Sequence, residues 1–216
     1  MRYLFFSFSL LILMACASQP KNNSGSFKDL FNGIDLNNWI GNKSAYQVKN
    51  GAIIIEPEAG GSGGNLYTKE VYANFILQFE FLLTPGANNG LGIHTPLEGD
   101  PAYVGKEIQI LDNTAEKYAN LKAYQYHGSV YGIAPAKRGH LAPVGQWNKE
   151  EVFVKDNLIR VTLNETVIVE TDLNIAIENG TMDNRDHPGL FKKEGHIAFC
   201  GHGDVVHFRN IRIKEL

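Results

Sequence analysis

The chain has 216 residues, with 20 lysines and arginines against 23 aspartates and glutamates, and a formal net charge of −3 at pH 7. This slightly acidic balance provides no basic surface of the kind that binds nucleic acid, so nucleic-acid partners are not expected. Two cysteines exclude a framework of several disulfides, and the length fits one folded domain behind a short leader.

The first 15 residues have the composition of a signal peptide. Arg2 precedes an apolar run from Leu4 to Ala15 that only two serines interrupt. About 20 apolar residues are needed to cross a bilayer as a helix, so the run favours a signal over a permanent transmembrane helix.

The signal ends in Leu13-Met14-Ala15-Cys16, which resembles the bacterial lipobox. The resemblance implies removal of residues 1–15 and acylation of Cys16, with residues 16–26 as lipid anchor and flexible tether. We therefore expect a membrane-anchored protein of the cell envelope, at the outer membrane or the periplasmic face. An ordinary secretory signal with an incidental cysteine is the alternative. With Cys16 acylated, the remaining Cys200 lies in an apolar segment and is expected to be a buried thiol.

Residues 27–216 are predicted to form one domain of short strands. The pair Asn50-Gly51, between Tyr46–Lys49 and Ala52–Ile55, predicts a hairpin, because Asn-Gly supplies the positive φ angles of a two-residue turn. Residues 74–83 alternate between apolar and mixed positions, which predicts a strand with one face in the core. The core set is Phe75, Leu77, Phe79, Phe81 and Leu83.

The second half of the domain has the same character. Residues 152–155, 158–163 and 166–170 predict a three-stranded meander. In residues 205–214 the apolar alternation changes phase, which predicts a bulge near Arg209-Asn210. Helical candidates are limited to short pieces within 113–120 and 172–179. The sequence thus predicts an all-β fold, a sandwich of two antiparallel sheets of the jelly-roll kind.

The segment from Lys106 to Asp112 carries the most chemical information. In a strand, Glu107 and Gln109 share one face while two isoleucines point to the other, so a polar pair lies on a sheet whose back packs into the core. Asp112 would fall on the opposite face unless a one-residue bulge at Ile110-Leu111 returned it. A solvated edge strand is the alternative.

The spacing Glu-x-Gln-x-x-Asp resembles the Glu-x-Asp-x-x-Glu of laminarinase-type jelly-roll glycosidases. Gln109 replaces the central acid and Asp112 the final one, and these departures argue against a conventional retaining glycosidase.

Three further segments, 88–94, 124–132 and 201–204, combine glycine with groups that hydrogen-bond sugar hydroxyls. No His-Glu-x-x-His or other short metal-ligand spacing is present, so a catalytic zinc is not predicted. A divalent metal held by His94, Glu107 and His202 from distant strands is left open. The candidate substrate-binding residues of these segments and their neighbours are His94, Tyr126, Tyr131 and Trp147.

Six segments in order resemble the 3-keto-disaccharide hydrolase domain family. They are Phe31-Asn32-Gly33-Ile34-Asp35-Leu36-Asn37-Asn38-Trp39, Asn89-Gly90-Leu91-Gly92-Ile93-His94, Glu107-Ile108-Gln109-Ile110-Leu111-Asp112, Val130-Tyr131-Gly132, Gly145-Gln146-Trp147-Asn148 and Phe208-Arg209-Asn210-Ile211-Arg212-Ile213. Two segments depart from the family pattern. His94-Thr95-Pro96 stands where many members have an arginine, and Phe199-Cys200-Gly201-His202-Gly203 where they have Leu-Gln-Asp-His-Gly.

The resemblance implies a concanavalin A-like sandwich that cleaves 3-keto-glycosides or 3-keto-disaccharides. A ketone at carbon 3 acidifies the hydrogen on carbon 2, so a base can remove it and the group on carbon 1 departs by elimination, with net hydrolysis if water then adds. A non-catalytic carbohydrate-binding envelope lipoprotein is the alternative.

The expected roles divide among a few polar residues. Glu107 or His127 is the candidate base, and Asp112 or His202 the candidate group that assists departure of the leaving oxygen. Positioning or stabilising roles fall to Gln109, Tyr131 and Arg209, and a structural role at the bulge is the alternative for Arg209.

Overall fold

The computed structural model describes Met1 and residues 25–55 and 64–216. The predicted signal peptide, Cys16 and most of the tether lie in residues 2–24 and so fall outside the described part. In the described residues, no helix is long and apolar enough to cross a membrane.

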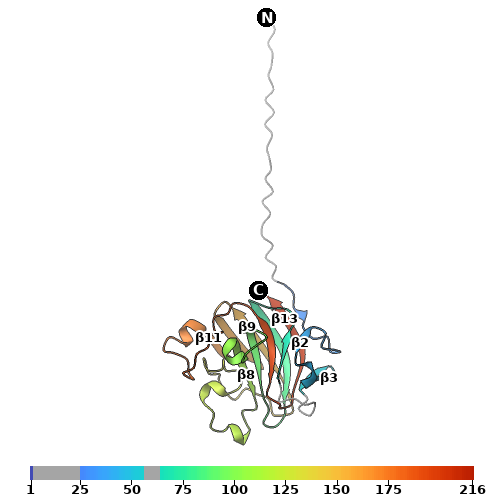
Figure 1. The fold of residues 1–216 in the computed structure, drawn as a ribbon, viewed down its shortest axis with the longest axis vertical. Helices are drawn as coiled ribbons and strands as arrows, with labels where there is room; N and C mark the ends of the chain where they lie inside the picture. The colour runs from blue at the N-terminus through green and yellow to red at the C-terminus, as the bar shows by residue number, and fades with distance from the viewer. Residues whose placement is uncertain (2–24, 56–63) are drawn as a thin grey trace.

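Two antiparallel sheets face each other across the core, which confirms the predicted all-β sandwich (Figure 1). Sheet A has the order β11 (Thr166–Asp172), β10 (Leu158–Leu163), β9 (Trp147–Lys155), β6 (Phe75–Leu83), β13 (Val206–Glu215), β4 (Ala52–Ile55) and β3 (Tyr46–Lys49), and β1 (Lys28–Asp29) pairs with β13. Sheet B has the order β2 (Trp39–Gly41), β5 (Gly64–Thr68), β12 (His196–Gly201), β7 (Asn88–Thr95) and β8 (Lys106–Leu111).

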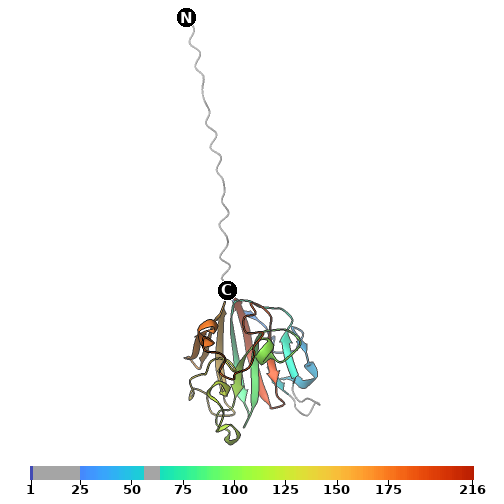
Figure 2. The ribbon, with the colours of Figure 1, turned by 60° about the vertical axis from the view of Figure 1, so that its left-hand side comes forward.

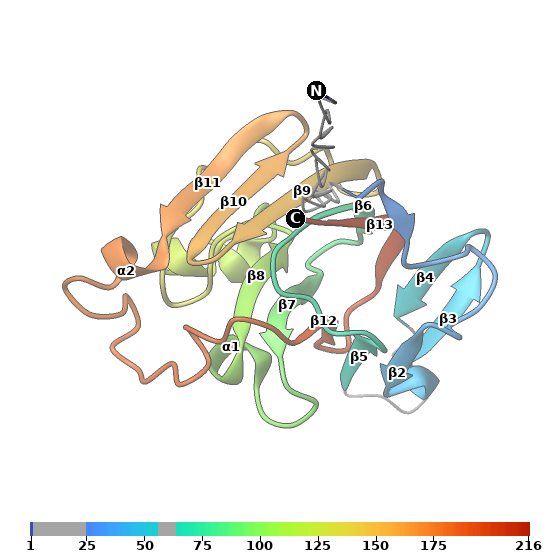
Figure 3. The same ribbon diagram turned by 90° about the horizontal axis from the view of Figure 1, so that it is seen from above.

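The view from above shows the two layers, with β11, β10, β9 and β6 in one and β8, β7, β12 and β5 in the other (Figure 3). Helical structure in the described residues is limited to α1 (Pro101–Val104), α2 (Leu173–Ala176) and 3₁₀ turns at Lys43–Ala45, Glu116–Tyr118 and Ala123–Gln125. The short helical pieces predicted within 113–120 and 172–179 are therefore confirmed. Figure 2 shows the C-terminus at one end of the domain and the chain near residue 120 at the other.

The core lies between the sheets and is rich in aromatic rings. The side chains of β6 alternate as predicted, since Phe75, Leu77, Phe79, Phe81 and Leu83 are all at most 2% exposed. Rings from the two sheets meet directly: Phe199 of sheet B stacks on Phe208 of sheet A with centroids 3.9 Å apart. Full burial of one such side chain contributes about 1.5–3 kcal/mol, so these contacts hold the two layers together.

The predicted turns and bulge form at the expected residues. Asn50 and Gly51 have φ angles of 54° and 73° and connect β3 to β4 in the register Lys49 to Ala52. In β13 the pairing steps from Arg209–Glu80 to Arg212–Gln78, so one extra residue is inserted, and Asn210 has φ of 52°. The hairpin, the C-terminal meander of β9, β10 and β11, and the β13 bulge are thus confirmed.

The bulge that would return Asp112 to the Glu107 face does not form in β8. The pairing of β7 with β8 runs regularly from Ile93–Lys106 to Asn88–Leu111, and the Asp112 amide extends it by donating to Ala87 O at 2.9 Å. Alternation therefore leaves Asp112 on the face opposite Glu107.

The outer edge of β8 is covered by the chain that follows it. Gln109 N donates to Ser129 O at 3.0 Å, Gly128 N to Gln109 O at 2.7 Å, and Tyr131 N to Glu107 O at 2.9 Å. These bonds satisfy backbone groups that an edge strand otherwise exposes. Glu107 and Gln109 are only 5% and 6% exposed, so the alternative of a solvated edge strand is also wrong.

A buried contact between an imidazole and a carboxyl group ties this covering segment to the opposite sheet. His127 Nε2 lies 3.0 Å from Glu150 Oε2 of β9, and both side chains are at most 1% exposed. The two atoms are not aligned as a hydrogen bond, and among the described residues neither Glu150 oxygen has a hydrogen-bond partner. The carboxylate therefore depends on the electrostatic contact with the imidazole.

Replacing one member of this pair should destabilise the domain strongly. We expect His127→Ala to lower the free energy of unfolding by about 3–5 kcal/mol, because the buried carboxyl group of Glu150 is left without its partner. The double variant His127→Phe/Glu150→Met should lose less than the sum of its single variants, since both polar partners are replaced by apolar groups. Urea unfolding of the single and double variants measures this coupling, and strictly additive losses would contradict it.

Candidate active site

A groove of about 290 Å³ lies on the outer face of sheet B, beside the covered edge of β8. Its floor comes from β7 and β8, and its walls come from α1 and three connecting segments. The polar side chains that line it are Asn88, Asp100, Tyr103, Glu107, Gln109, Tyr118, Gln125, Tyr131, Arg185 and His202.

The floor follows from the alternation of β8 and the glycines of β7. Glu107, Gln109 and Leu111 face the groove, while the isoleucines between them are fully buried in the core. A Cβ atom built on Gly90 would lie 1.9 Å from Glu107 Oε1. Only glycine therefore leaves the Glu107 carboxylate room to lie across the neighbouring strand.

Glu107 contacts the one histidine of the groove. His202 follows β12, and its Nε2 lies 3.9 Å from Glu107 Oε1. The contact with Glu107 raises the pKa of His202 above its usual value, against the lowering effect of partial burial. The His202 side chain is 48% exposed and that of Glu107 is 6% exposed, so the imidazole and a nearly buried carboxyl group meet at the groove surface.

Two amides and a phenol complete the floor. Gln109 Nε2 donates to Asn88 Oδ1 at 2.8 Å, which fixes the orientation of both amides. The Tyr131 hydroxyl accepts a 3.5 Å bond from Gln125 Nε2. Amides and hydroxyls held in fixed positions can hydrogen-bond the hydroxyls of a sugar ring.

Tyr103 and Arg185 form a wall that the sequence did not reveal. Tyr103 belongs to α1, and Arg185 Nη1 donates to its hydroxyl at 2.6 Å. Both residues lie outside the strands, in stretches with no alternation and no recognisable motif. Only the tertiary fold brings them to the groove.

Two residues predicted to act in catalysis lie elsewhere. The Asp112 carboxylate accepts bonds from Gly86 N at 2.8 Å and from Thr114 N and Oγ1 at 2.9 and 2.6 Å. Burial raises the pKa of Asp112, but these hydrogen bonds outweigh it and lower the pKa below its usual value. The structure thus makes Asp112 a turn cap, and it places His127 in the core against Glu150.

His94 lies at the opposite end of β7 from Asn88. Its Nε2 contacts Ala73 O at 2.7 Å, and Lys106 Nζ lies 2.8 Å from its Nδ1. The pKa of His94 is lowered to about 4, mainly by burial and to a smaller extent by the charge of Lys106. His94, Glu107 and His202 are therefore not brought together. Among the described residues, no group of three or more His, Cys, Asp or Glu side chains could hold a metal ion.

The remaining predicted aromatic and cationic residues also lie away from the groove. Tyr126 is buried with Arg138 over its ring at 4.4 Å. Trp147 belongs to sheet A, where the Arg209 guanidinium lies 3.8 Å from its ring centre and Arg209 Nε donates to Glu80 Oε2 at 2.7 Å. These contacts support the structural role for Arg209 beside the bulge.

Cys200 is buried, and burial raises its pKa well above the usual value, as expected of an unreactive thiol.

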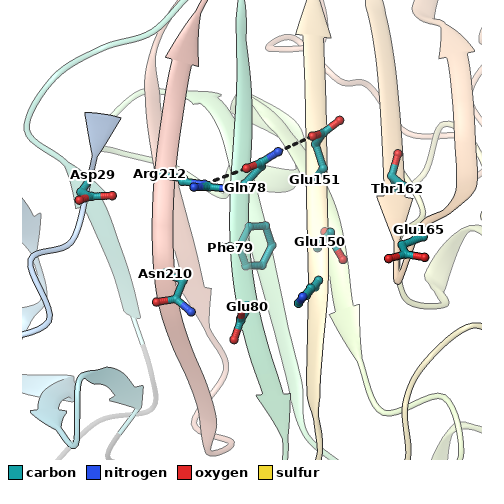
Figure 4. Close-up of a pocket in the computed structure, with 11 residues that line it drawn as sticks. Asp29, Gln78, Phe79, Glu80, Glu150, Glu151, Thr162, Glu165, Asn210 and Arg212 are labelled. Carbon is teal, nitrogen blue, oxygen red and sulfur yellow. Dashed lines mark hydrogen bonds between the residues drawn. The ribbon is translucent and has the colours of Figure 1, made fainter. Parts of the chain in front are cut away.

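A second hollow of about 490 Å³ crosses the outer face of sheet A (Figure 4). Three of its polar side chains are joined by hydrogen bonds. Gln78 Nε2 donates to Glu151 Oε2 at 2.6 Å, and Arg212 Nε donates to Gln78 Oε1 at 2.8 Å. The residues described around it include no imidazole. The smaller groove of sheet B, with its contact of carboxylate and imidazole, is therefore the better candidate for chemistry.

Comparison with known proteins agrees with this fold. The chain is 28% identical to a Bacteroides thetaiotaomicron protein named 3-keto-disaccharide hydrolase, over 87% of this chain and 77% of that protein. A crystal structure from Parabacteroides distasonis, named as a candidate glycosyl hydrolase, superposes with a TM-score of 0.77 at 28% identity, over 89% of this chain and all of that one. Carbohydrate-binding module 66 from Bacillus subtilis, at 10% identity and a TM-score of 0.54 over 82% of this chain and 96% of the module, shares the fold.

The family model described as a 3-keto-alpha-glucoside-1,2-lyase-like domain matches residues 26–214, which include both sheets and every residue of the groove. The chain therefore belongs to the 3-keto-alpha-glucoside-1,2-lyase-like domain family.

Proposed function

We propose that this protein cleaves the glycosidic bond of 3-keto-glycosides, including 3-keto-disaccharides, by removing the proton on carbon 2. The observation that carries the proposal is the contact of Glu107 with His202 on the groove floor. The family and the named relatives support glycoside cleavage in general. The keto-sugar specificity and the elimination step are proposed from the resemblance to this family, with roles assigned to the residues of the groove.

In the proposed reaction Glu107 is the base. Its carboxylate takes the proton from carbon 2, and the electrons of that C–H bond form an enolate with the ketone at carbon 3. The enolate electrons then form the double bond between carbons 1 and 2 as the bond from carbon 1 to the leaving oxygen breaks. His202 gives its proton to that oxygen. Addition of water to the double bond completes a net hydrolysis.

The other groove residues suit a sugar ring. The coupled amides of Gln109 and Asn88 and the Tyr131 hydroxyl are placed to orient ring hydroxyls over Glu107. The volume of about 290 Å³ lies at the lower end of ligand pockets, which suits one ring with the leaving group outside.

Glu107→Gln tests the assignment of the base. We expect its turnover of a 3-keto-glucoside to fall by roughly 10²–10⁴-fold, because an amide of the same shape cannot take the proton. Glu170→Gln, at an exposed position of the edge strand β11, is the matched control and should keep full activity. Aglycone release is followed by mass spectrometry, with and without a chelator, and the unoxidised glucoside is run in parallel.

Each result of this assay has a distinct meaning. Full activity of Glu107→Gln would remove the main assignment, and release from the unoxidised glucoside would indicate a conventional glycosidase. Loss of activity with chelator would bring a divalent metal into the mechanism. Sugar binding without release from either substrate would favour the non-catalytic carbohydrate-binding alternative.

The pH dependence should follow His202. Because Glu107 raises the His202 pKa, the imidazole stays protonated to a higher pH than usual, and kcat should fall as the pH rises through that pKa. In Glu107→Gln the His202 midpoint should move down, measured by NMR titration of its ring protons. His207 on sheet A, whose pKa is lowered by burial, is the internal control and should not move. An unchanged His202 midpoint would contradict the coupling.

We also propose that the protein is anchored in the cell envelope through acylated Cys16, as the lipobox-like segment indicates. Cys16→Ala should move the protein from the membrane fraction to the soluble fraction and abolish labelling by a fatty-acid analogue. Cys200→Ala is the control. Because the Cys200 thiol is buried in the domain, this substitution should leave both readouts unchanged. Membrane association that survives Cys16→Ala would contradict the anchor.

A further inference from the structure

The groove has one permanent positive charge among the described residues that line it, the guanidinium of Arg185. Asp100 and Glu107 are the acidic side chains among the described residues of the same lining. When a reaction builds negative charge on a substrate oxygen, a nearby cation stabilises the transition state. Arg185 is therefore the natural source of that stabilisation.

Arg185 reaches the groove through Tyr103. Its Nη1 donates to the Tyr103 hydroxyl oxygen at 2.6 Å, and its guanidinium carbon lies 5.6 Å from the ring centre. Because the phenol oxygen accepts this bond, its own O–H proton points elsewhere and can be donated to a ligand. A hydroxyl that accepts from a cation is polarised and becomes a stronger donor.

The pair is held in place by neighbouring side chains. Asp183 accepts a hydrogen bond from Arg185 N at 3.1 Å and contacts His187 Nε2 at the same distance. The His187 ring in turn lies 4.9 Å from the Tyr103 ring. Asp100 caps α1 by accepting from Ala102 N at 3.1 Å, so the backbone that carries each member of the pair is held by a side chain.

Tyr131 is another phenol of the groove lining, and it is less suited to this role. Its hydroxyl accepts only a 3.5 Å bond from the neutral amide of Gln125. Burial also raises the Tyr131 pKa, which makes its proton a weaker donor.

We propose that the Tyr103 hydroxyl donates a hydrogen bond to the carbon 3 oxygen of the substrate as the enolate forms, and that Arg185 is a positioning residue that polarises this phenol. The inference rests on the proposed function, because it assigns a partner to the oxyanion of that reaction. No proton is transferred in this step. The electron pair released from the C–H bond at carbon 2 rests on the oxygen at carbon 3 and returns when the bond to the leaving oxygen breaks.

The test compares Tyr103→Phe and Arg185→Gln with wild type on a 3-keto-glucoside in deuterated buffer. Two rates are followed, deuterium uptake at carbon 2 and aglycone release. We expect Tyr103→Phe to lower kcat and the exchange rate together by roughly 10²–10³-fold, the usual cost of one oxyanion donor, with KM within threefold of wild type. Arg185→Gln should lower both rates by about tenfold, and Arg185→Lys should recover part of that loss because it restores the charge without the planar donor.

The matched controls lie far from the groove. Tyr72→Phe replaces a phenol packed under Lys28, and Arg160→Gln replaces an arginine stacked on Phe153 of sheet A. Both should leave the two rates unchanged, and thermal unfolding checks that every variant is folded.

The outcomes separate the two proposals. If wild type shows neither exchange nor release, the proposed function fails and this inference fails with it. If wild type is active and Tyr103→Phe stays within threefold in kcat, the inference alone is overturned and Glu107 keeps its role. Should Tyr103→Phe not fold, Arg185→Gln decides, because its side chain is exposed, and unchanged rates in that variant would overturn the inference.

Discussion

The hydrogen bonds that join residues 126–134 to the free edge of β8 are the contacts on which the groove depends. A polar strand at the edge of a sheet would otherwise be solvated, and a carboxylate on it would be one more surface charge. Covered in this way, Glu107 and Gln109 lie in a nearly dry setting with fixed neighbours. Electrostatic interactions are stronger in such a setting than in water. The interaction between a catalytic base and its partner is therefore strengthened there.

The covering segment is itself held by a polar contact in an apolar core. His127 reaches Glu150 of the opposite sheet, so the wall that carries Tyr131 is linked to sheet A. Sandwich cores rarely place a carboxylate between their layers, because desolvation is costly. Here the contact also fixes the segment beside the groove in place. The stacking of Phe199 on Phe208 contributes to the apolar packing between the two sheets.

Most of the fold follows from local sequence patterns. Strand alternation in residues 74–83 and the Asn50-Gly51 turn are decided by side-chain period and backbone preference, and both signals are local. The same alternation placed Glu107 and Gln109 on one face. It could not show whether β8 stays regular at Leu111, and so the position of Asp112 was predicted wrongly.

The parts of the site that sequence could not reveal depend on contacts between distant segments. His94, His127 and His202 all lie in glycine-containing segments, and only burial separates a core imidazole from one that faces the groove. Tyr103 and Arg185 lie 82 positions apart in segments without periodicity, and their hydrogen bond exists only in the assembled fold.

The placement of the chain ends adds a spatial consequence. Lys28 of β1 pairs with Glu215 at the end of β13, at 2.8 Å, whereas His202 lies just before the start of the same strand. Ten residues of β-strand span roughly 33 Å. If the proposed acylation of Cys16 ties the N-terminal segment to a membrane, the length of β13 acts as a spacer between the lipid headgroups and the mouth of the groove. A soluble sugar would then enter without competing for space with the bilayer.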